Sequence, residues 1–492
     1  MSGHYVEEAR REKLNSIRER GIEPFAYCFK RTHTTVEAVN AFREDEEVTV
    51  VVAGRIVALR SKGKTTFGNI QDHMGNVQFY ARKDEMGEDA YSLFKLLDLG
   101  DHVGLSGFMF KTRTGETTVH VKSVELLSKA LRPLPTGKVD ADGELHGGLT
   151  DVETRYRERY ADLAVHEDVR SRFRLRAQIV SYLRRFLDER GYVEVETPVL
   201  QPLYGGAMAR PFVTHYHALD ATFYLRIATE LYLKRCIVGG LDRVYEIGKD
   251  FRNEGIDREH NPEFTMLEFY EAYADYSDIM RLVEEMIHGL VVEIDGSSSV
   301  DRFGTTLDFT PPWTRVTYTE AVREHAGIDL ETAEEATMRA ALANREIEGL
   351  DTMPRTKLID SLFGEFVEPQ LQQPTFVVDF PIEISPLAKP KRGNPELAER
   401  FELFIRGKEL ANAFSELNDP EDQRRRFEAQ TRAREAGDDE AHQIDDDYVR
   451  ALEYGMPPTG GCGIGIDRLV MLLAEQPSIR DVVLYPMLRP DE

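Results

Sequence analysis

Between residues 48 and 127 the sequence alternates short β-branched and aromatic runs with glycine and asparagine turns, and no other feature constrains the fold as strongly. The pattern predicts three strands, then a helix over 88–100, then two more strands. The predicted strands cover 48–59, 65–72, 76–83, 101–110 and 117–127. Three strands, one helix and two strands is the layout of an OB-fold, a small barrel that often binds single-stranded oligonucleotides. Other small β-domains share this order.

The predicted barrel is flanked by a helical segment and a linker. Residues 5–20 place apolar side chains at near-helical spacing among Arg and Glu. The segment RPLPTGKVDADGELHGG (132–148) is rich in Pro, Gly and Asp, and we interpret it as a linker. The domains expected along the chain are a helical extension over 1–45, an OB-fold domain over 46–131, a linker over 132–150 and a second domain over 151–492.

The second half of the chain predicts an α+β domain. Residues 172–200 read as a long amphipathic helix, a turn at Gly191 and a short alternating strand that ends at Pro198. Strands and helices follow without the regular alternation that a parallel sheet requires. Residues 320–372 are mostly helical and charged, and we interpret them as an insertion.

Composition excludes several classes of protein. The longest apolar stretches, such as 469–474, are too short to span a bilayer, and the charged start lacks the apolar core of a secretory signal. The three cysteines lie far apart, so we expect ordinary thiols, no structural zinc site and a cytoplasmic location. The formal net charge of −25 argues against non-specific coating of nucleic acid, although one local surface remains free to bind it.

The segment 243–276 places charged side chains among buried ones. Arg252 and Glu254 are two residues apart in an expected strand, and Glu268 and Tyr270 repeat that spacing in a second strand. Two such strands predict a concave site lined by charged groups. A solvated sheet face is the commoner cause of this pattern, but the interleaved apolar residues indicate strands that are buried on both sides.

The segment 399–423 repeats this logic. Asn412, Phe414 and Glu416 alternate, so their side chains share one face of a strand. Glu402 and Glu409 precede them and offer oxygen ligands of the kind that Mg²⁺ prefers. As an isolated pair, these two glutamates would more commonly be surface acids.

The segment GGCGIGIDRLVMLL (460–473) joins a glycine-rich strand to an apolar helix. Its glycines let a ligand approach the backbone closely, and Arg468 lies where it can meet a phosphate. A single Gly-x-Gly is weak evidence. The run TPV (197–199), FRNEG (from 251) and GIGIDR (from 463), in that order, is far more specific.

These three stretches resemble motifs 1, 2 and 3 of the class II aminoacyl-tRNA synthetases, and longer stretches resemble the lysine-specific branch of that family. Among the latter are GLTDVETRYRERYADL, RIATELYLKR, FRNEGIDREHNPEFTMLEFYEAYADY and ELANAFSELNDPEDQ. The resemblance implies an OB-type anticodon-binding domain, an antiparallel-sheet catalytic domain and a homodimer. It also implies activation of L-lysine with ATP and transfer of lysine to tRNA(Lys), with Mg²⁺ as cofactor.

The resemblance also assigns roles to matching positions. Arg252 and Arg468 would be the catalytic arginines: Arg252 would bridge the lysine carboxylate and the α-phosphate, and Arg468 would hold the γ-phosphate. Glu402 and Glu409 would carry Mg²⁺. The implied ATP-binding residues are Arg252, Glu254, His260, Phe264 and Arg468. The implied lysine-binding residues are Gly206, Glu230, Arg252, Glu268, Tyr270, Asn412, Phe414 and Glu416. The implied anticodon-binding residues are Phe67, Gln78 and Glu125.

Physical chemistry supports the lysine pocket independently, because a buried ammonium needs paired acids and hydrogen-bond acceptors. For Phe67 a place in the barrel core is a serious alternative to anticodon contact, and for Glu125 a structural role is equally probable on sequence alone. Two other functions compete: a paralogue that lysylates a protein, which would lack the OB-domain, and a non-catalytic nucleic-acid-binding descendant, which would have lost Arg252, Glu409 or Arg468.

Overall fold

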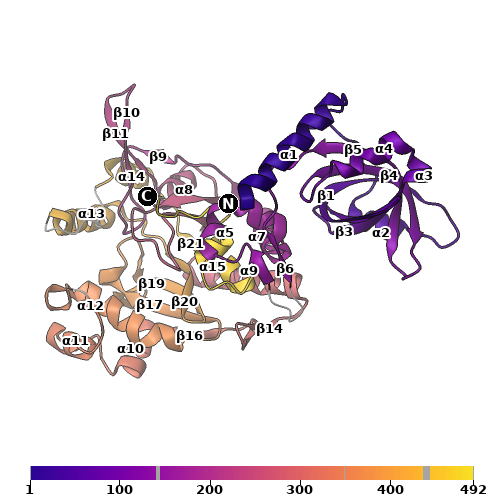
Figure 1. The fold of residues 1–492 in the computed structure, drawn as a ribbon. Helices are drawn as coiled ribbons and strands as arrows, with labels where there is room; N and C mark the ends of the chain where they lie inside the picture. The colour runs from indigo at the N-terminus through magenta and orange to yellow at the C-terminus, as the bar shows by residue number, and fades with distance from the viewer. Residues whose placement is uncertain (1, 140–144, 348, 436–443, 491–492) are drawn as a thin grey trace. The chain divides into compact units, whose positions relative to one another are not determined.

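A computed structural model describes residues 2–139, 145–347, 349–435 and 444–490. Contacts between residues divide the chain into two compact units (Figure 1). The first contains the chain up to Arg155 together with Tyr160–Val165, and the second contains Tyr156–Arg159 and the chain from His166. The domain boundaries expected from the sequence stay a prediction. Two short helices, α5 (Val152–Arg157) and α6 (Arg159–Val165), lie where the chain passes between the units.

The first unit is a closed five-stranded barrel, which confirms the OB-fold prediction. Its strands follow each other in the order β1-β2-β3-β5-β4, and the parallel pair β3–β5 closes the barrel. Alternation of buried and partly exposed residues along each strand fills the interior with apolar side chains. The bounds are β1 (Thr49–Lys62), β2 (Thr65–Gln71), β3 (Asn76–Arg82), β4 (His102–Lys111) and β5 (Thr117–Ser128), with helices α1 (Ser2–Glu19), α2 (Thr35–Ala41) and α3 (Lys83–Met86).

One expectation in this unit is wrong in detail. The helix expected over 88–100 is only α4 (Glu88–Ser92) followed by one 3₁₀ turn (Leu93–Lys95). It ends early because the chain turns back on itself: the Asp98 amide donates to the Asp101 carboxylate, and Gly100 has a φ of 98°. The segment interpreted as a linker contains β6 (Thr136–Val139) and β7 (Leu145–Gly148), which pair antiparallel, and its role as a linker stays a prediction; residues 140–144 of that segment lie outside the described residues.

The second unit contains a nine-stranded mixed sheet, so the α+β class is confirmed. The strand order is β16-β17-β19-β20-β21-β13-β12-β8, with β18 beside β19, and only the pairs β16–β17 and β12–β8 are parallel. The bounds are β8 (Val193–Glu194), β12 (Arg243–Phe251), β13 (Glu263–Ala272), β16 (Thr314–Thr317), β17 (Thr375–Pro381), β18 (Pro390–Lys391), β19 (Asn394–Ile405), β20 (Lys408–Ser415) and β21 (Thr459–Gly465).

Helices cover one face of this sheet and leave the central part of the other face for a cavity. α9 (Tyr276–Asp295) and α15 (Ile466–Leu473) pack their apolar stripes onto β13, β20 and β21, and α7 (Glu167–Asp188) packs against α9, α15 and the edge strand β8 (Figure 1). The expected helical segment 320–372 forms α10 (Tyr318–Ala326), α11 (Glu335–Leu342) and α12 (Arg355–Leu362) with an apolar core of its own. The remaining helices are α8 (Glu230–Val238), α13 (Pro420–Glu435), α14 (Asp446–Glu453) and α16 (Ile479–Val482).

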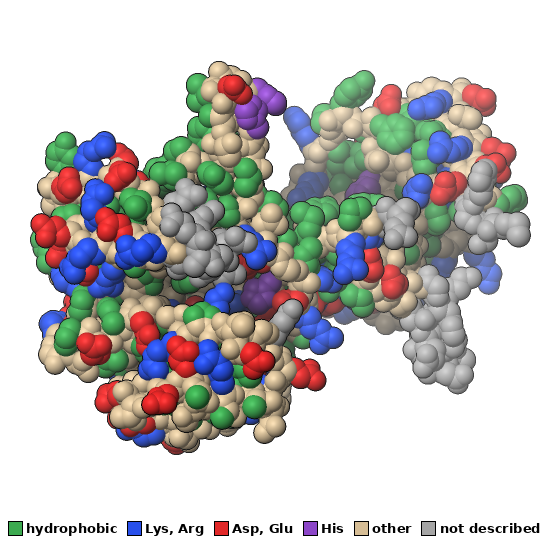
Figure 2. All heavy atoms as spheres, turned by 90° about the vertical axis from the view of Figure 1, so that its left-hand side faces the viewer, with side chains coloured by type: hydrophobic (Ala, Val, Ile, Leu, Met, Phe, Trp, Pro, Cys, Tyr) green, Lys and Arg blue, Asp and Glu red, His purple; other side chains and the backbone are tan. Residues whose placement is uncertain are grey.

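A three-stranded sheet and one hairpin complete the second unit. The small sheet has the order β10-β11-β9, with β9 (Leu200–Gln201), β10 (Val213–Tyr216) and β11 (Ala221–Leu225). The hairpin consists of β14 (Ser299–Arg302) and β15 (Thr305–Asp308). Across the described ranges, no helix combines the length and the apolarity needed to cross a bilayer. Acidic and basic side chains are interspersed on the face shown in Figure 2, so the net negative charge is not gathered into one patch there.

A buried ion pair ties the long helix α7 to the sheet. Arg176 on α7 donates to the Asp467 carboxylate over 2.6 Å, and Asp467 also accepts the backbone N–H of Thr265 in β13 over 2.7 Å. The Asp467 side chain is 3% exposed. Because Asp467 lies at the start of α15, this contact fixes the point where the glycine-rich strand becomes a helix.

We expect Asp467→Asn to lower the free energy of unfolding by about 3 kcal/mol, because it leaves a largely buried guanidinium without its counter-charge. Chemical denaturation of the full chain measures this loss. The matched control is Glu293→Gln, which breaks another α7 ion pair, that of Arg185, in which both side chains are about half exposed. The control should lose less than about 1 kcal/mol. Equal losses in the two variants would contradict a structural role for Asp467.

Candidate active site

One cavity of about 530 Å³ lies over the middle of the large sheet, where strand β21 presents glycines instead of side chains. Gly461 pairs with Tyr270 on one side and with Phe414 on the other. Gly463 pairs in the same way with Glu268 and Asn412. The glycine row therefore forms the floor of a trough whose two walls are side chains of β13 and β20.

The register extends these rows to strand β19. Asn412 pairs with Glu402, and Phe414 pairs with Arg400. Since paired residues point to the same side of a sheet, polar side chains from the three strands β13, β20 and β19 face one space above the glycines of β21. The predicted alternation of residues 412, 414 and 416 is correct for the two residues in β20, and Glu416 lies one residue beyond the end of that strand.

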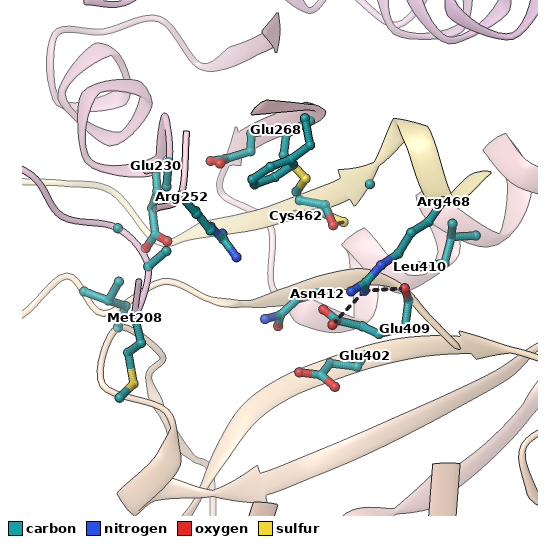
Figure 3. A pocket seen from close by; sticks show the side chains of 18 of the residues that line it. Met208, Glu230, Arg252, Glu268, Glu402, Glu409, Leu410, Asn412, Cys462 and Arg468 are labelled. Atoms are coloured by element: carbon teal, nitrogen blue, oxygen red, sulfur yellow. Dashed lines mark hydrogen bonds and ion pairs between the residues drawn. The ribbon is translucent and has the colours of Figure 1, made fainter. Parts of the chain in front are cut away.

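The structure brings together every site residue that the sequence predicts for the second domain. The residues that line the cavity include Gly206, Glu230, Arg252, Glu254, His260, Phe264, Glu268, Tyr270, Glu402, Glu409, Asn412, Phe414, Glu416 and Arg468. In Figure 3, Glu402, Glu409 and Arg468 lie at one end of the cavity, and Glu230 and Arg252 lie at the other.

The expectation that Arg252 and Glu254 lie in a strand is wrong. Strand β12 ends at Phe251, and both residues are in the extended loop that follows. The chain leaves β13 at this point: the Arg252 N–H still donates to Pro262 O over 2.9 Å, but the Asn253 N–H donates to Arg210 O over 2.8 Å. The Arg252 guanidinium carbon lies 5.0 Å from the centre of the Phe264 ring. A cation thus lies over an aromatic ring, and both side chains line the cavity.

Glu268 is a buried acid whose own chain provides only neutral hydrogen-bond donors. Its side chain accepts hydrogen bonds from the Tyr270 hydroxyl over 3.0 Å and from the Thr229 N–H over 3.2 Å. Among the described residues no Lys or Arg pairs with it. Burial, followed by repulsion from Asp250 and Glu230, raises the pKa of Glu268 to about 8. The carboxyl is thus in place for a cation that the chain itself does not supply.

Behind this acid lies a fully buried lysine that the sequence analysis did not single out. Lys234 on α8 forms ion pairs with Glu230, one helical turn earlier, and with Glu416. Burial alone would lower the pKa of Lys234, but the two carboxylates raise it above its ordinary value. The i,i+4 spacing of Glu230 and Lys234 in the sequence was the available signal for this pair.

The other end of the cavity gathers carboxylates and arginines. Glu402 pairs with Arg400 over 2.5 Å, and Arg468 donates to the backbone oxygen of Glu409 over 2.8 Å and to its carboxylate over 3.2 Å (Figure 3). Burial raises the pKa of Glu402 to about 8; Arg400 opposes this shift and the charge of Glu409 adds to it. Crowded like charges of this kind are relieved by an added cation. Arg400 and Asp360, which also lines this end, are further cavity residues that sequence reasoning missed.

The described residues contain no preformed group of three His, Cys, Asp or Glu side chains that could hold a metal ion. Glu402 and Glu409 therefore offer two carboxylates at most, and oxygens from a bound ligand or from water would have to complete the coordination of a hard cation. His260, which also lines the cavity, is held by Asp257, whose carboxylate lies 2.8 Å from its Nδ1.

On the barrel, Phe67 is a surface residue, so the alternative that places it in the core is wrong. Its side chain is 38% exposed, and its ring centre lies 4.6 Å from that of Tyr80. Gln78 points to the same outer side, since Asn69 is its partner across β2 and β3, and it accepts a hydrogen bond from Thr118. Glu125 lies further along β5, where that strand pairs only with β4. The structure groups Phe67 and Gln78 but not Glu125.

Comparison with known proteins agrees with this architecture. Residues 151–489 match the model of the tRNA synthetases class II (D, K and N), and residues 50–127 match that of the OB-fold nucleic acid binding domain. The chain therefore belongs to the class II tRNA synthetases of the D, K and N group. Relatives that it matches over more than nine-tenths of their length are proteins named lysine–tRNA ligase.

Three of these relatives show how extensive the match is. The lysine–tRNA ligase of Moorella thermoacetica is 54% identical over 98% of this chain and 97% of its own length. That of Pelotomaculum thermopropionicum is 53% identical over 98% of this chain and 94% of its own length. That of Bacillus subtilis is 50% identical over 98% of this chain and 97% of its own length.

We expect the floor of the cavity to tolerate no side chain at position 461. A Cβ on Gly461 would lie 2.1 Å from Glu416 Oε1 and 2.4 Å from Tyr270 Cε1, so Gly461→Ala should cost about 1–3 kcal/mol of stability through overpacking. In the same strand, a Cβ on Gly463 would meet only the flexible end of Met266, at 3.2 Å, and the Glu268 side chain at 3.7 Å. Gly463→Ala should therefore cost less than Gly461→Ala in thermal denaturation. The reverse order would contradict the geometry of the trough.

Proposed function

We propose that this chain is a lysine–tRNA ligase, which activates L-lysine with ATP and transfers it to the 3′ end of tRNA(Lys). The observation that carries the choice of amino acid is the buried Glu268–Tyr270 pair, an acid and a phenol with which no Lys or Arg of the described residues forms an ion pair. A site for an acidic or a neutral side chain would leave this acid unpaired at high cost. Membership of the D, K and N synthetases supplies the reaction class.

The two ends of the bound lysine would meet different groups. Glu230, beside Gly206, would accept hydrogen bonds from the α-ammonium. Glu268, Tyr270 and Glu416 would surround the ε-ammonium. Phe414 would form the wall along the methylene chain, and Asn412 would help to orient the substrate. Gly206 has a φ of 90°, and its backbone packs closely against Glu230. A Cβ at position 206 would be 3.1 Å from the Glu230 Cβ.

The nucleotide would take the rest of the cavity. Arg252 would bridge the lysine carboxylate and the α-phosphate, so that one guanidinium aligns the attacking oxygen with the phosphorus. Phe264 and Arg468 would stack on the two faces of the adenine, Arg468 would also hold the γ-phosphate, and Glu254 would accept a hydrogen bond from the adenine edge. His260 would lie near the terminal phosphates. This scheme uses alignment and neutralisation of charge and needs no side chain as a nucleophile.

Glu402 and Glu409 would hold Mg²⁺, which neutralises triphosphate charge when bound. The raised pKa of Glu402 supports this role, because a divalent cation relieves the repulsion between the two carboxylates. Neither glutamate would need to move far, since they lie on the neighbouring strands β19 and β20.

The barrel would bind the anticodon of tRNA(Lys). The exposed Phe67 ring would stack on a base, Gln78 would read a base edge, and Glu125 would contact the loop from its separate place on β5. Three free thiols, Cys28, Cys236 and Cys462, support the proposal that the enzyme works in the cytoplasm.

The amino acid preference of ATP–pyrophosphate exchange tests this function directly. Lysine should support exchange, and aspartate and asparagine should not. Exchange with aspartate in place of lysine would reassign the chain within its family. Absence of exchange with every amino acid would favour a non-catalytic binding protein.

The chain is expected to work as a homodimer through α7 and the segment that follows it. Exposed apolar side chains cluster after α7, among them Val193, Val199, Leu200 and Leu203, and such a cluster supports a protein interface. Sedimentation at micromolar concentration should give twice the chain mass. A fully active monomer would contradict the prediction.

The affinity for lysine should rise with pH up to about 8. With its pKa near 8, the Glu268 carboxyl of the free enzyme is mostly protonated at neutral pH, and the proton competes with the substrate ammonium. The lysine KM in pyrophosphate exchange should therefore fall about tenfold for each pH unit below the pKa and level off above it. Glu268→Gln should abolish this dependence. A lysine KM that does not change with pH in the natural enzyme would show that Glu268 does not titrate on binding.

Phe67→Ala should impair tRNA charging by roughly tenfold or more and leave pyrophosphate exchange nearly unchanged. One stacked base is worth about 1–3 kcal/mol, and this contact exists only when tRNA is bound. Tyr27→Ala is the matched control, since Tyr27 is an exposed aromatic residue of the same unit that is given no part in binding. If Phe67→Ala reduces exchange as much as charging, the residue acts on folding instead.

A further inference from the structure

A buried cation of the chain, Lys234, lies next to the lysine pocket without lining it, and none of the roles assigned above involves it. Lys234 is completely buried, and its ammonium lies between the carboxylates of Glu230 and Glu416. Its Nζ lies 5.3 Å from the centre of the Phe414 ring, which is the expected wall for the substrate chain. Lys234 therefore sits directly behind the residues that would touch the amino acid, without being among the residues that line the cavity.

Lys234 has no surface exposed to solvent. Tyr448 of α14 is fully buried beside the cluster, and its hydroxyl has no hydrogen-bond partner among the described residues. The pKa of Tyr448 is raised by burial, with Lys234 opposing this shift and Glu416 adding to it. An ammonium in such a place is stable only while both of its carboxylates are present.

A count of charges connects this buried lysine with the substrate. With their carboxyls ionised, Glu230, Glu268 and Glu416 carry three negative charges, of which Lys234 balances one. Two negative charges remain for the ligand. A dibasic amino acid brings two ammonium groups, and its own carboxylate is taken by Arg252. The pocket is electrically balanced when such a ligand is bound.

We propose that Lys234 is a positioning residue that sets the selectivity of the pocket for a dibasic amino acid, by holding Glu230 and Glu416 in place and fixing the uncompensated charge at minus two. This inference rests on the proposed function and deepens it. In this arrangement Glu416 would interact with two cations, the Lys234 ammonium and the ε-ammonium of the substrate. One of its oxygens pairs with Lys234, and the other, Oε1, stands over the glycine floor at position 461, on the cavity side.

In a double-mutant cycle, the proposal predicts that two substitutions together raise the lysine KM less than either one alone. Lys234→Met keeps the length of the side chain and leaves three carboxylates for two substrate cations. Glu416→Gln keeps the size of the side chain and leaves one uncompensated charge for two cations. Each single variant should raise the lysine KM in pyrophosphate exchange by about a hundredfold, at the lower end of the cost of breaking a buried pair.

The double variant removes one cation and one anion together and restores the charge of minus two. Its lysine KM should return to within about tenfold of the natural enzyme, because a buried ion pair can be replaced by neutral groups of similar volume at little cost. The ATP KM should stay within about threefold in all three variants, since the nucleotide contacts lie elsewhere. Discrimination between lysine and norleucine, which lacks the ε-ammonium, should fall in Glu416→Gln and recover in the double variant.

The matched control is Arg235→Met, the next residue on the same helix. Arg235 pairs with Asp445 and Asp447, away from the cavity, so its loss should leave the lysine KM unchanged. If Lys234→Met does not fold, the comparison of Glu416→Gln with the double variant decides alone: the double variant must have the lower lysine KM.

Three outcomes would overturn the proposal. They are an unchanged lysine KM in Lys234→Met, a double variant as impaired as the product of the two single variants, and a double variant no better than Glu416→Gln. None of these outcomes would contradict the proposed function if the natural enzyme shows lysine-dependent exchange. Absence of that exchange in the natural enzyme would instead remove the proposed function itself.

Discussion

The second unit depends on how the charge of its buried acids is compensated. Glu268, Glu402 and Glu416 are all buried in one cavity, and each would be too costly there without a partner. Arg400 and Lys234 supply two of the partners from the chain. Among the described residues the third acid, Glu268, has only neutral hydrogen-bond donors, so a cation from a ligand would complete its environment. The same electrostatic interactions therefore determine both the selectivity of the cavity for its ligand and the stability of the fold around it.

Much of the architecture follows from alternation along strands. The five barrel strands and the strand faces at Glu268, Tyr270, Asn412 and Phe414 were predictable because side chains of a strand alternate between two sides, whatever lies next to them. The order of motifs was equally informative, since residues from segments far apart in the chain meet in one cavity. The alternation within each strand predicted which side chains meet in the cavity, because the site is built on the central strands of the sheet.

The parts that escaped prediction depend on contacts across long stretches of chain. The end of β12 before Arg252 is set by the loop opposite, which the sequence of the strand does not encode. The early end of the helix after Glu88 follows from a turn held by Asp98 and Asp101. Lys234 pairs with Glu416 across 182 positions, and no local pattern reports such a partner. Whether a charged residue is buried depends on the tertiary fold.

The glycine-rich strand has a consequence for how this fold can diversify. Because Gly461 and Gly463 contribute space and no chemical groups, the shape of the cavity and its preference for a ligand are encoded by different residues. Substitutions in β13 and β20 can exchange one set of walls for another while the floor stays the same. An ancestral protein with such a floor can give rise to descendants with different substrates. Each descendant keeps the same cavity and has different side chains in its walls.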